Sequence, residues 1–168
     1  MEFLGLLTAM GIGRFAYTPI LPLMQQEINF SQVMAGYLAS INYLGYLIGA
    51  ILASIIPWKD KRTSFLRLSL LISIITTGAM GLTSSFVWWL ILRFIAGISS
   101  ALIFVLISSI VIDVLVANKK DTWIGIFYSG VGLGIAMTGL GVPVLNKYFN
   151  WEGAWIGLAL ISILTSIV

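Results

Sequence analysis

Two arginines, Arg14 and Arg93, carry the most chemical information in this sequence, because each lies well inside a long apolar stretch. An arginine at the centre of a membrane-spanning helix costs roughly 2.5–3.5 kcal/mol on insertion scales. Every carboxylate lies in a connection or near a helix end, away from both arginines: Glu2, Glu27, Asp60, Asp113, Asp121 and Glu152. Since a buried charge needs compensation, tyrosine, asparagine, backbone carbonyls, a further half of the protein or a bound anion must provide it. We predict that both arginines face a cavity for an anionic substrate; the alternative is that they are structural and internally paired.

Polar and helix-breaking residues follow Arg14 closely. Tyr17 and Thr18 stand at i+3 and i+4, on the same face of a helix as the guanidinium. Pro19 and Pro22 lack an N–H donor and should each free a carbonyl one turn earlier. This pattern predicts a bend or broken turn that lines a binding site, or else an ordinary transmembrane kink.

A second apolar stretch offers further candidates for the cavity. Tyr43 and Tyr46 could face it, together with Asn42. Asn42 also shares helical spacing with Gly45 and Gly49, which favours close helix packing with one interhelical hydrogen bond.

Small residues recur on the later stretches as well. One turn after Arg93, Gly97 would let a neighbouring helix approach closely. The fifth stretch is glycine-rich and is predicted to be a tightly packed or flexing helix through Gly130, Gly134 and Gly139.

Composition excludes several kinds of chemistry. The chain has no Cys and no His, which removes thiolate chemistry, the commonest metal ligand and the usual proton relay. No carboxylate pair or phosphate-binding loop is present, so we predict no enzyme, no metal and no cofactor. The nine basic residues are scattered, unlike the clustered patch of a nucleic-acid binder.

Six apolar stretches of about twenty residues must position these side chains, and each is long enough to span a bilayer as a helix. Hydrophobic residues make up 60% of the chain and charged residues 9%, with a mean hydropathy of +1.06. We predict an all-α membrane protein, residues 1–168 forming one domain of six transmembrane helices joined by short connections. The predicted helices are 3–24, 33–57, 65–82, 86–112, 122–145 and 152–168.

Charges and tryptophans near the helix ends predict the orientation. Alternate connections collect the basic residues, namely Lys59, Lys61, Arg62 and Arg67 in one and Lys119 and Lys120 in another, against Lys147 alone on the opposite side. By the positive-inside rule, the N-terminus is cytoplasmic in a multi-pass protein of the inner (plasma) membrane. The six tryptophans fall at or near predicted helix ends and are expected to anchor in the lipid headgroup layer: Trp58, Trp88, Trp89, Trp123, Trp151 and Trp155.

The two halves of the chain show traces of an internal repeat. Arg14 and Phe15 correspond to Arg93 and Phe94. Four residues of the second stretch align without gaps to four of the fifth: Gly36, Ser40, Leu44 and Gly45 to Gly125, Ser129, Leu133 and Gly134. The matches are consistent with a 3+3 inverted repeat.

The segments GIGRFAYTPILPLM (11–24) and AGYLASINYLGYLIG (35–49) resemble the YbfB/YjiJ-type branch of the major facilitator superfamily. The superfamily's fourth-helix motif is matched by Arg93, Gly97 and Ala101, although Ala96 replaces its glutamine. Only Lys61 and Arg62 remain of the basic loop motif, with Pro57 where an aspartate is usual, and Ile135 replaces the proline of the fifth-helix motif.

The resemblance implies the N-terminal six-helix half of a secondary active transporter. Such a protein binds a small-molecule substrate near the bilayer midplane between two halves that rock to alternate access. The chain ends inside an apolar run, so we expect a C-terminal six-helix half to follow it. A homodimer of six-helix chains and a non-transporting membrane scaffold or assembly subunit are the alternatives.

Overall fold

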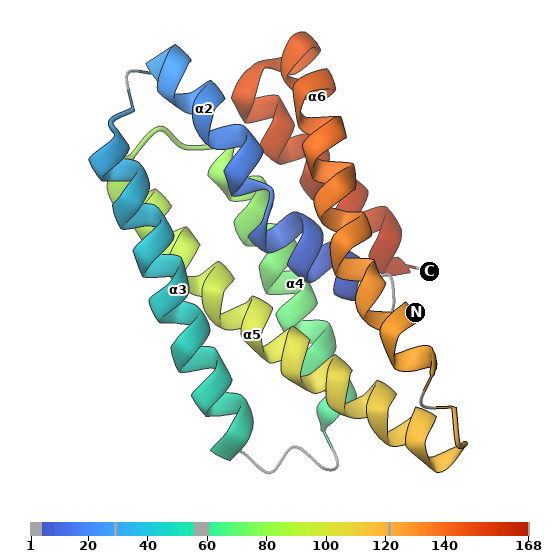
Figure 1. The fold of residues 1–168 in the computed structure, drawn as a ribbon. Helices are drawn as coiled ribbons and strands as arrows, with labels where there is room; N and C mark the ends of the chain where they lie inside the picture. The colour runs from blue at the N-terminus through green and yellow to red at the C-terminus, as the bar shows by residue number, and fades with distance from the viewer. Residues whose placement is uncertain (1–4, 29, 56–60, 121, 168) are drawn as a thin grey trace.

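The computed structural model of this chain is a bundle of long helices that run up and down in alternation (Figure 1). It describes residues 5–28, 30–55, 61–120 and 122–167, and this described part contains no strand. Its elements in chain order are η1 (Leu7–Arg14), α2 (Tyr17–Ile28), α3 (Gln32–Ile55), α4 (Arg62–Met80), α5 (Phe86–Ala117) and α6 (Trp123–Ile167). The predicted all-α class is confirmed.

Four of these helices, α3, α4, α5 and α6, are long and apolar enough to cross a membrane. Large apolar side chains stand exposed along their outer faces, among them Leu47, Ile75 and Leu140. Such faces suit lipid contact, since hydrocarbon tails are as apolar as these side chains.

The first predicted helix is interrupted at Phe15 and Ala16, which form a turn between η1 and α2. Before the turn the chain is a π-helix, and the N–H of Phe15 donates to the carbonyl of Met10 at 3.2 Å. Pro19 has no N–H to offer the carbonyl of Phe15, which accepts from the N–H of Thr18 instead, at 3.2 Å. The helix then resumes and continues to Ile28, four residues beyond the predicted end.

The chain turns inside the predicted connection at 146–151, but the non-helical part is shorter than predicted. Helical backbone continues through Phe149, and a single residue, Asn150, reverses the chain with φ 58° and ψ −173°. Asparagine is among the non-glycine residues found most often at positive φ. The segments on either side of Asn150 form the orange and red arms of α6 in Figure 1. Elsewhere α5 extends five residues past its predicted end, to Ala117.

Glycines mark the places where helices approach backbone to backbone. At the α3–α5 contact, a Cβ added to Gly49 would lie 2.6 Å from the carbonyl oxygen of Ile98. Gly45 and Gly97 face the partner helix's backbone in the same way, at Phe94 and Asn42. At the contact of η1 with α6, a Cβ on Gly134 would lie 2.7 Å from the carbonyl oxygen of Leu7. Only glycine allows these approaches.

The other two glycines singled out on α6 differ. Gly130 is buried. Gly139 is exposed, and a Cβ added there would meet no atom within 4 Å in the described structure. Of the two roles predicted for Gly139, tight packing and flexing, tight packing is absent in the described part of the chain.

Three tryptophans form part of the protein core, so the expectation that they anchor in the headgroup layer was wrong for them. Trp89, Trp151 and Trp155 are each 1% exposed. The Trp89 ring meets those of Trp151 and Phe30 edge to face, at 5.8 Å and 5.5 Å, and its Nε1–H donates to the carbonyl of Met80 at 3.1 Å. Because the helices converge at this end, neighbouring helices provide the hydrogen-bond acceptor and the packing surface that the headgroup layer would otherwise provide. Trp88 and Trp123 are exposed, whereas Trp58 lies outside the described residues.

Replacing Trp89 with phenylalanine should lower stability measurably. The change removes the hydrogen bond and leaves the Met80 carbonyl unpaired, a loss of about 1–2 kcal/mol. Thermal unfolding in detergent would show a lower Tm. The matched control is Trp88→Phe, on the same helix but 59% exposed, where a shift of less than about 0.5 kcal/mol is expected. Equal shifts at both positions would contradict the core assignment.

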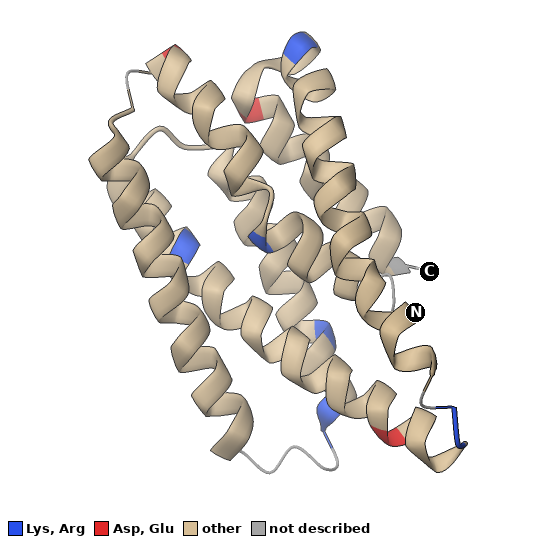
Figure 2. Cartoon of the chain, in the orientation of Figure 1, with Lys and Arg blue, Asp and Glu red and all other residues tan. Residues whose placement is uncertain are grey.

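Charged residues gather at the ends of the bundle, and basic residues also occur in its middle (Figure 2). At one end Arg62 and Asp113 form an ion pair with an N–O distance of 2.8 Å. Lys61 immediately precedes α4 at that end, and Lys119 and Lys120 lie in the connection from α5 to α6. Lys59 lies outside the described residues. The two most basic connections thus share one end of the bundle.

Candidate functional site

Six of the seven predicted cavity residues line one cavity of about 240 Å³ between α2, α3 and α5. Arg14 comes from the end of η1, and Arg93 comes from α5. The complete lining is Arg14, Phe15, Tyr17, Thr18, Leu21, Ala39, Asn42, Tyr43 and Arg93. Residues separated by almost eighty positions therefore enclose one space containing two guanidinium groups.

Arg14 is surrounded by aromatic rings. Its Cζ lies 3.9 Å from the centroid of the Tyr46 ring, 5.5 Å from that of Tyr43 and 5.8 Å from that of Phe15. Each ring face is negative and attracts a cation, and the attraction is stronger away from water. Tyr46 does not line the cavity itself but holds the arginine that does. The charge of Arg14 is thus stabilised by the protein's own side chains.

The charge of Arg93 is less well compensated than that of Arg14. Arg93 is 4% exposed, its Cζ lies 4.4 Å from one ring, that of Tyr17, and its buried Nε has no hydrogen-bond partner. The ion pair of Arg62 with Asp113 does not involve it, and no described carboxylate lies within 4 Å of its guanidinium. A buried guanidinium with an unused donor is suited to bind an anion.

Two hydrogen bonds hold the walls of the cavity in place. The Tyr17 hydroxyl donates to the carbonyl of Ala35 at 3.0 Å, which ties α2 to α3. Asn42 Nδ2–H donates to the backbone carbonyl of Arg93 at 2.8 Å, which ties α3 to α5. Neither bond uses the Arg93 guanidinium, so the frame stays intact while the guanidinium remains free for a ligand.

Some lining residues escaped the sequence analysis. Leu21 stands four residues after Tyr17, and Ala39 stands three before Asn42, so helical spacing from the polar candidates would have found both. Phe15 lies in the turn that interrupts the first helix, where no helical periodicity applies. Thr18 and Tyr43 line the cavity but are exposed in these 168 residues, so one side of the site is open.

The donor set of the cavity is guanidinium, phenol, hydroxyl and amide. No group of three or more His, Cys, Asp or Glu side chains comes together among the described residues. The arrangement can bind and orient an anion through charge and hydrogen bonds, and it can stack planar groups on its tyrosine rings.

The sequence of this chain is similar to those of several membrane transporters. The chain is 25% identical over 166 residues to the uncharacterized MFS-type transporter YceJ of Bacillus subtilis, covering 99% of this chain and 42% of that protein. It is 22% identical to the hexuronate transporter of Bacillus subtilis, over 94% of this chain and 37% of that protein. It is 26% identical to the cis,cis-muconate transport protein of Acinetobacter baylyi, over 77% of this chain and 31% of that protein.

The chain thus spans less than half the length of these relatives. No solved structure matches it. A family model described as "Uncharacterised MFS-type transporter YbfB" matches residues 6–168, nearly the whole chain. With the helices long enough to cross a membrane and the predicted resemblance both in agreement, this chain belongs to the YbfB-type family of major facilitator superfamily transporters.

Proposed function

We propose that this chain is the N-terminal half of a secondary active transporter that moves a small carboxylate-bearing solute by alternating access. The observation that carries the proposal is the cavity, which holds two arginines and no described carboxylate. In a low-dielectric site, a fixed positive charge of this kind favours an anionic ligand strongly. The solute would occupy this cavity and be released when the cavity opens to the other side.

The helix contacts support a six-helix half built as an inverted repeat. Counting η1 with α2 as the first helix and the two arms of α6 as the fifth and sixth, the second helix packs on the fourth and the first on the fifth. Exchanging helices 1–3 with 4–6 converts one contact into the other. Glycine allows close backbone approach at both, through Gly45 and Gly134, which the sequence comparison aligned.

A partner should complete the open side of the cavity. Because the relatives are more than twice as long as the aligned part of this chain, we propose a C-terminal six-helix half as that partner. A second copy of this chain is the alternative partner. The mass of the single polypeptide distinguishes the two, because a polypeptide with both halves is heavier than the 18.3 kDa of these residues. We propose that the end of the bundle with the basic connections, and the N-terminus, face the cytoplasm in an inner (plasma) membrane protein, because basic residues are enriched on the cytoplasmic side.

The substrate class has support from two relatives. Hexuronates and cis,cis-muconate, after which those transporters are named, are carboxylates. A planar guanidinium binds a carboxylate through two parallel N–H···O bonds, and Arg93 has the unused donor for such a pair. The tyrosine rings beside it would suit an unsaturated or ring-containing carbon skeleton.

Solute uptake tests the proposal directly. The whole product of the gene, reconstituted into liposomes, should take up radiolabelled carboxylates such as hexuronates or muconate with saturable kinetics. The amide analogue of the same solute should be transported at least about tenfold less well, because it leaves the buried guanidinium unpaired. Equal uptake of acid and amide would overturn the carboxylate assignment. No flux of any solute would favour the alternative, a non-transporting membrane scaffold.

A further inference from the structure

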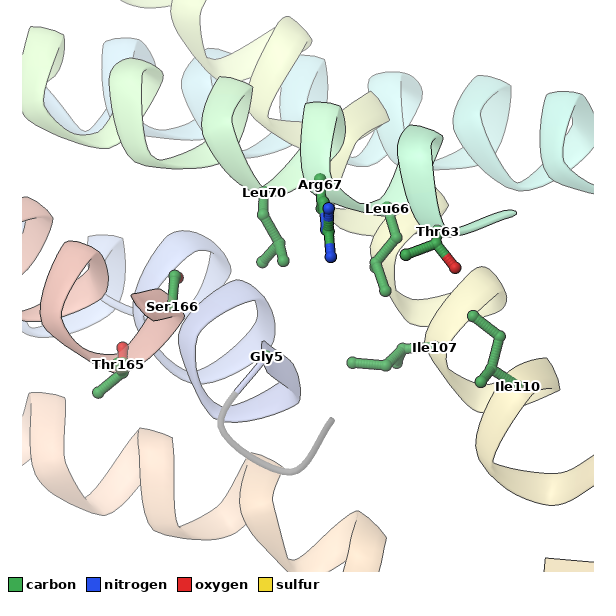
Figure 3. Close-up of a pocket in the computed structure, with 9 residues that line it drawn as sticks. All are labelled: Gly5, Thr63, Leu66, Arg67, Leu70, Ile107, Ile110, Thr165 and Ser166. Carbon is green, nitrogen blue, oxygen red and sulfur yellow. The ribbon is translucent and has the colours of Figure 1, made fainter. Parts of the chain in front are cut away.

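A second hollow lies at the end of the bundle that carries the basic connections. Its volume is about 230 Å³, and it is enclosed by the start of the chain, α4, α5 and the end of α6. Figure 3 shows the residues that line it: Gly5, Thr63, Leu66, Arg67, Leu70, Ile107, Ile110, Thr165 and Ser166. In this view Arg67 extends from α4 into the hollow, and Ser166 lies across from it. The hollow shares no residue with the cavity of Arg14 and Arg93.

An apolar furrow continues from this hollow along the outside of the bundle. It measures about 380 Å³ and runs between α4 and the second arm of α6. The two spaces share three lining residues, Arg67, Leu70 and Ser166. Beyond them the furrow is lined only by apolar side chains: Leu71, Ile74, Ile75 and Ile163. A hollow that contains one arginine and three hydroxyl side chains thus meets an apolar furrow at Arg67.

Arg67 has no ion-pair partner in the described structure. The arginine one and a half turns earlier on α4, Arg62, pairs with Asp113 at 2.8 Å, whereas Arg67 makes no such contact and is exposed. Five residues of helix separate the two, which is about 7.5 Å along the axis. If Arg62 marks the end of the membrane span, Arg67 lies at the level where headgroups meet acyl chains.

We propose that the hollow and furrow together bind one anionic phospholipid. The phosphate lies in the hollow and pairs with the Arg67 guanidinium. The hydroxyls of Thr63 and Ser166 line the same hollow. One acyl chain lies in the furrow against Ile75 and Ile163. Basic pockets between transmembrane helices favour anionic headgroups through charge, and the furrow explains why the ligand is a lipid, since a free phosphate would leave it unfilled. The proposal does not depend on the substrate of the transporter.

Lipid titration of the whole gene product tests the site. The protein, purified in mild detergent, is mixed with phosphatidylglycerol or with phosphatidylcholine of the same acyl chains, and bound lipids are counted by native mass spectrometry. We expect one phosphatidylglycerol to bind about tenfold more tightly than phosphatidylcholine, the effect of one charge-assisted hydrogen-bonded pair. Arg67→Gln should abolish this preference. Lys119→Gln, which removes an exposed charge at the same end, should leave it unchanged.

A second pair of variants tests the furrow without touching the charge. Ile75 and Leu68 lie on α4 and are 57% and 51% exposed, but only Ile75 lines the furrow. Ile75→Trp should weaken binding of both lipids, whereas Leu68→Trp should not. The proposal is overturned if Arg67→Gln retains the preference, or if Ile75→Trp and Leu68→Trp behave alike. It is also overturned if glycerol 3-phosphate competes as well as the lipid, which would indicate a site for soluble anions. Uptake assays are independent of each of these outcomes.

Discussion

Replacing Arg93 by glutamine is expected to lower kcat/KM for carboxylate uptake at least about 100-fold, because truncating one partner of a buried charge pair costs about 2–5 kcal/mol. Arg93→Lys should lose nearly as much, since an ammonium cannot form the two parallel bonds of a guanidinium. Arg14→Gln should cost less, about tenfold. The charge of Arg14 rests on three aromatic rings, while Arg93 has one ring and an unpaired Nε. Initial rates of uptake into proteoliposomes measure all three effects.

Stability separates a binding role of Arg93 from a structural one. Removing an unpaired buried charge relieves a desolvation penalty, so Arg93→Gln should unfold at the same or a higher temperature than the unmodified protein. The bond from Asn42 to the Arg93 backbone survives the change. Lys120→Gln, at an exposed position, serves as the control for general charge effects on uptake. Wild-type transport by Arg93→Gln would refute the proposed site, and a large fall in Tm would identify Arg93 as a structural residue.

Introducing a side chain at Gly97 is expected to separate α3 from α5. An alanine Cβ at this position would lie against the carbonyl of Asn42 and 2.9 Å from the N of Tyr46. Both are backbone atoms of a packed helix, so neither can move aside without displacing α3. Overpacking of this kind costs about 1–3 kcal/mol for alanine, and Gly97→Leu should prevent folding. The shift also displaces Asn42 and Tyr46, so uptake should fall with stability. Thermal unfolding and uptake rates measure the two effects.

A glycine that faces open space provides the matched control. Gly36 lies on α3, the same helix that Gly97 contacts, and a Cβ added there would meet no described atom within 4 Å. Gly36→Ala should therefore be neutral or slightly stabilising, since alanine favours helix over glycine by about 0.5–1 kcal/mol. If Gly97→Ala were as well tolerated as Gly36→Ala, the close approach of the two helices would be refuted.

Several site residues could be found from the sequence because the cost of a polar group in lipid does not depend on the details of the fold. Arg14 and Arg93 stand in apolar stretches, and the carboxylates stand at the ends of these stretches. No packing of such helices can bring a mid-span carboxylate to them from this part of the chain. Tyr17 and Thr18 followed from their helical spacing to Arg14, and Asn42 was a candidate as a polar residue in an apolar stretch. The structure brings them all to one cavity.

Other features depended on contacts between distant segments. Tryptophan near a helix end suits both a headgroup layer and a neighbouring helix, so only the convergence of α4, α5 and α6 decided that Trp89, Trp151 and Trp155 are core residues. Glycine likewise suits either tight packing or open space. Gly97 and Gly139 differ only in whether another helix passes beside them.

The amino-acid sequence by itself determined that this protein is helical and long enough to cross a membrane several times, and that its two mid-span arginines lack carboxylate partners. These properties follow from composition and from the length of each apolar segment, because every segment that crosses the bilayer must be long and apolar enough by itself. Only the tertiary structure decided that Arg14 is held by aromatic rings while Arg93 keeps an unused donor, and that Asn150 alone reverses the chain. Which side chains meet is determined by how whole helices dock, and hydrophobic periodicity along one helix carries no information about its neighbour.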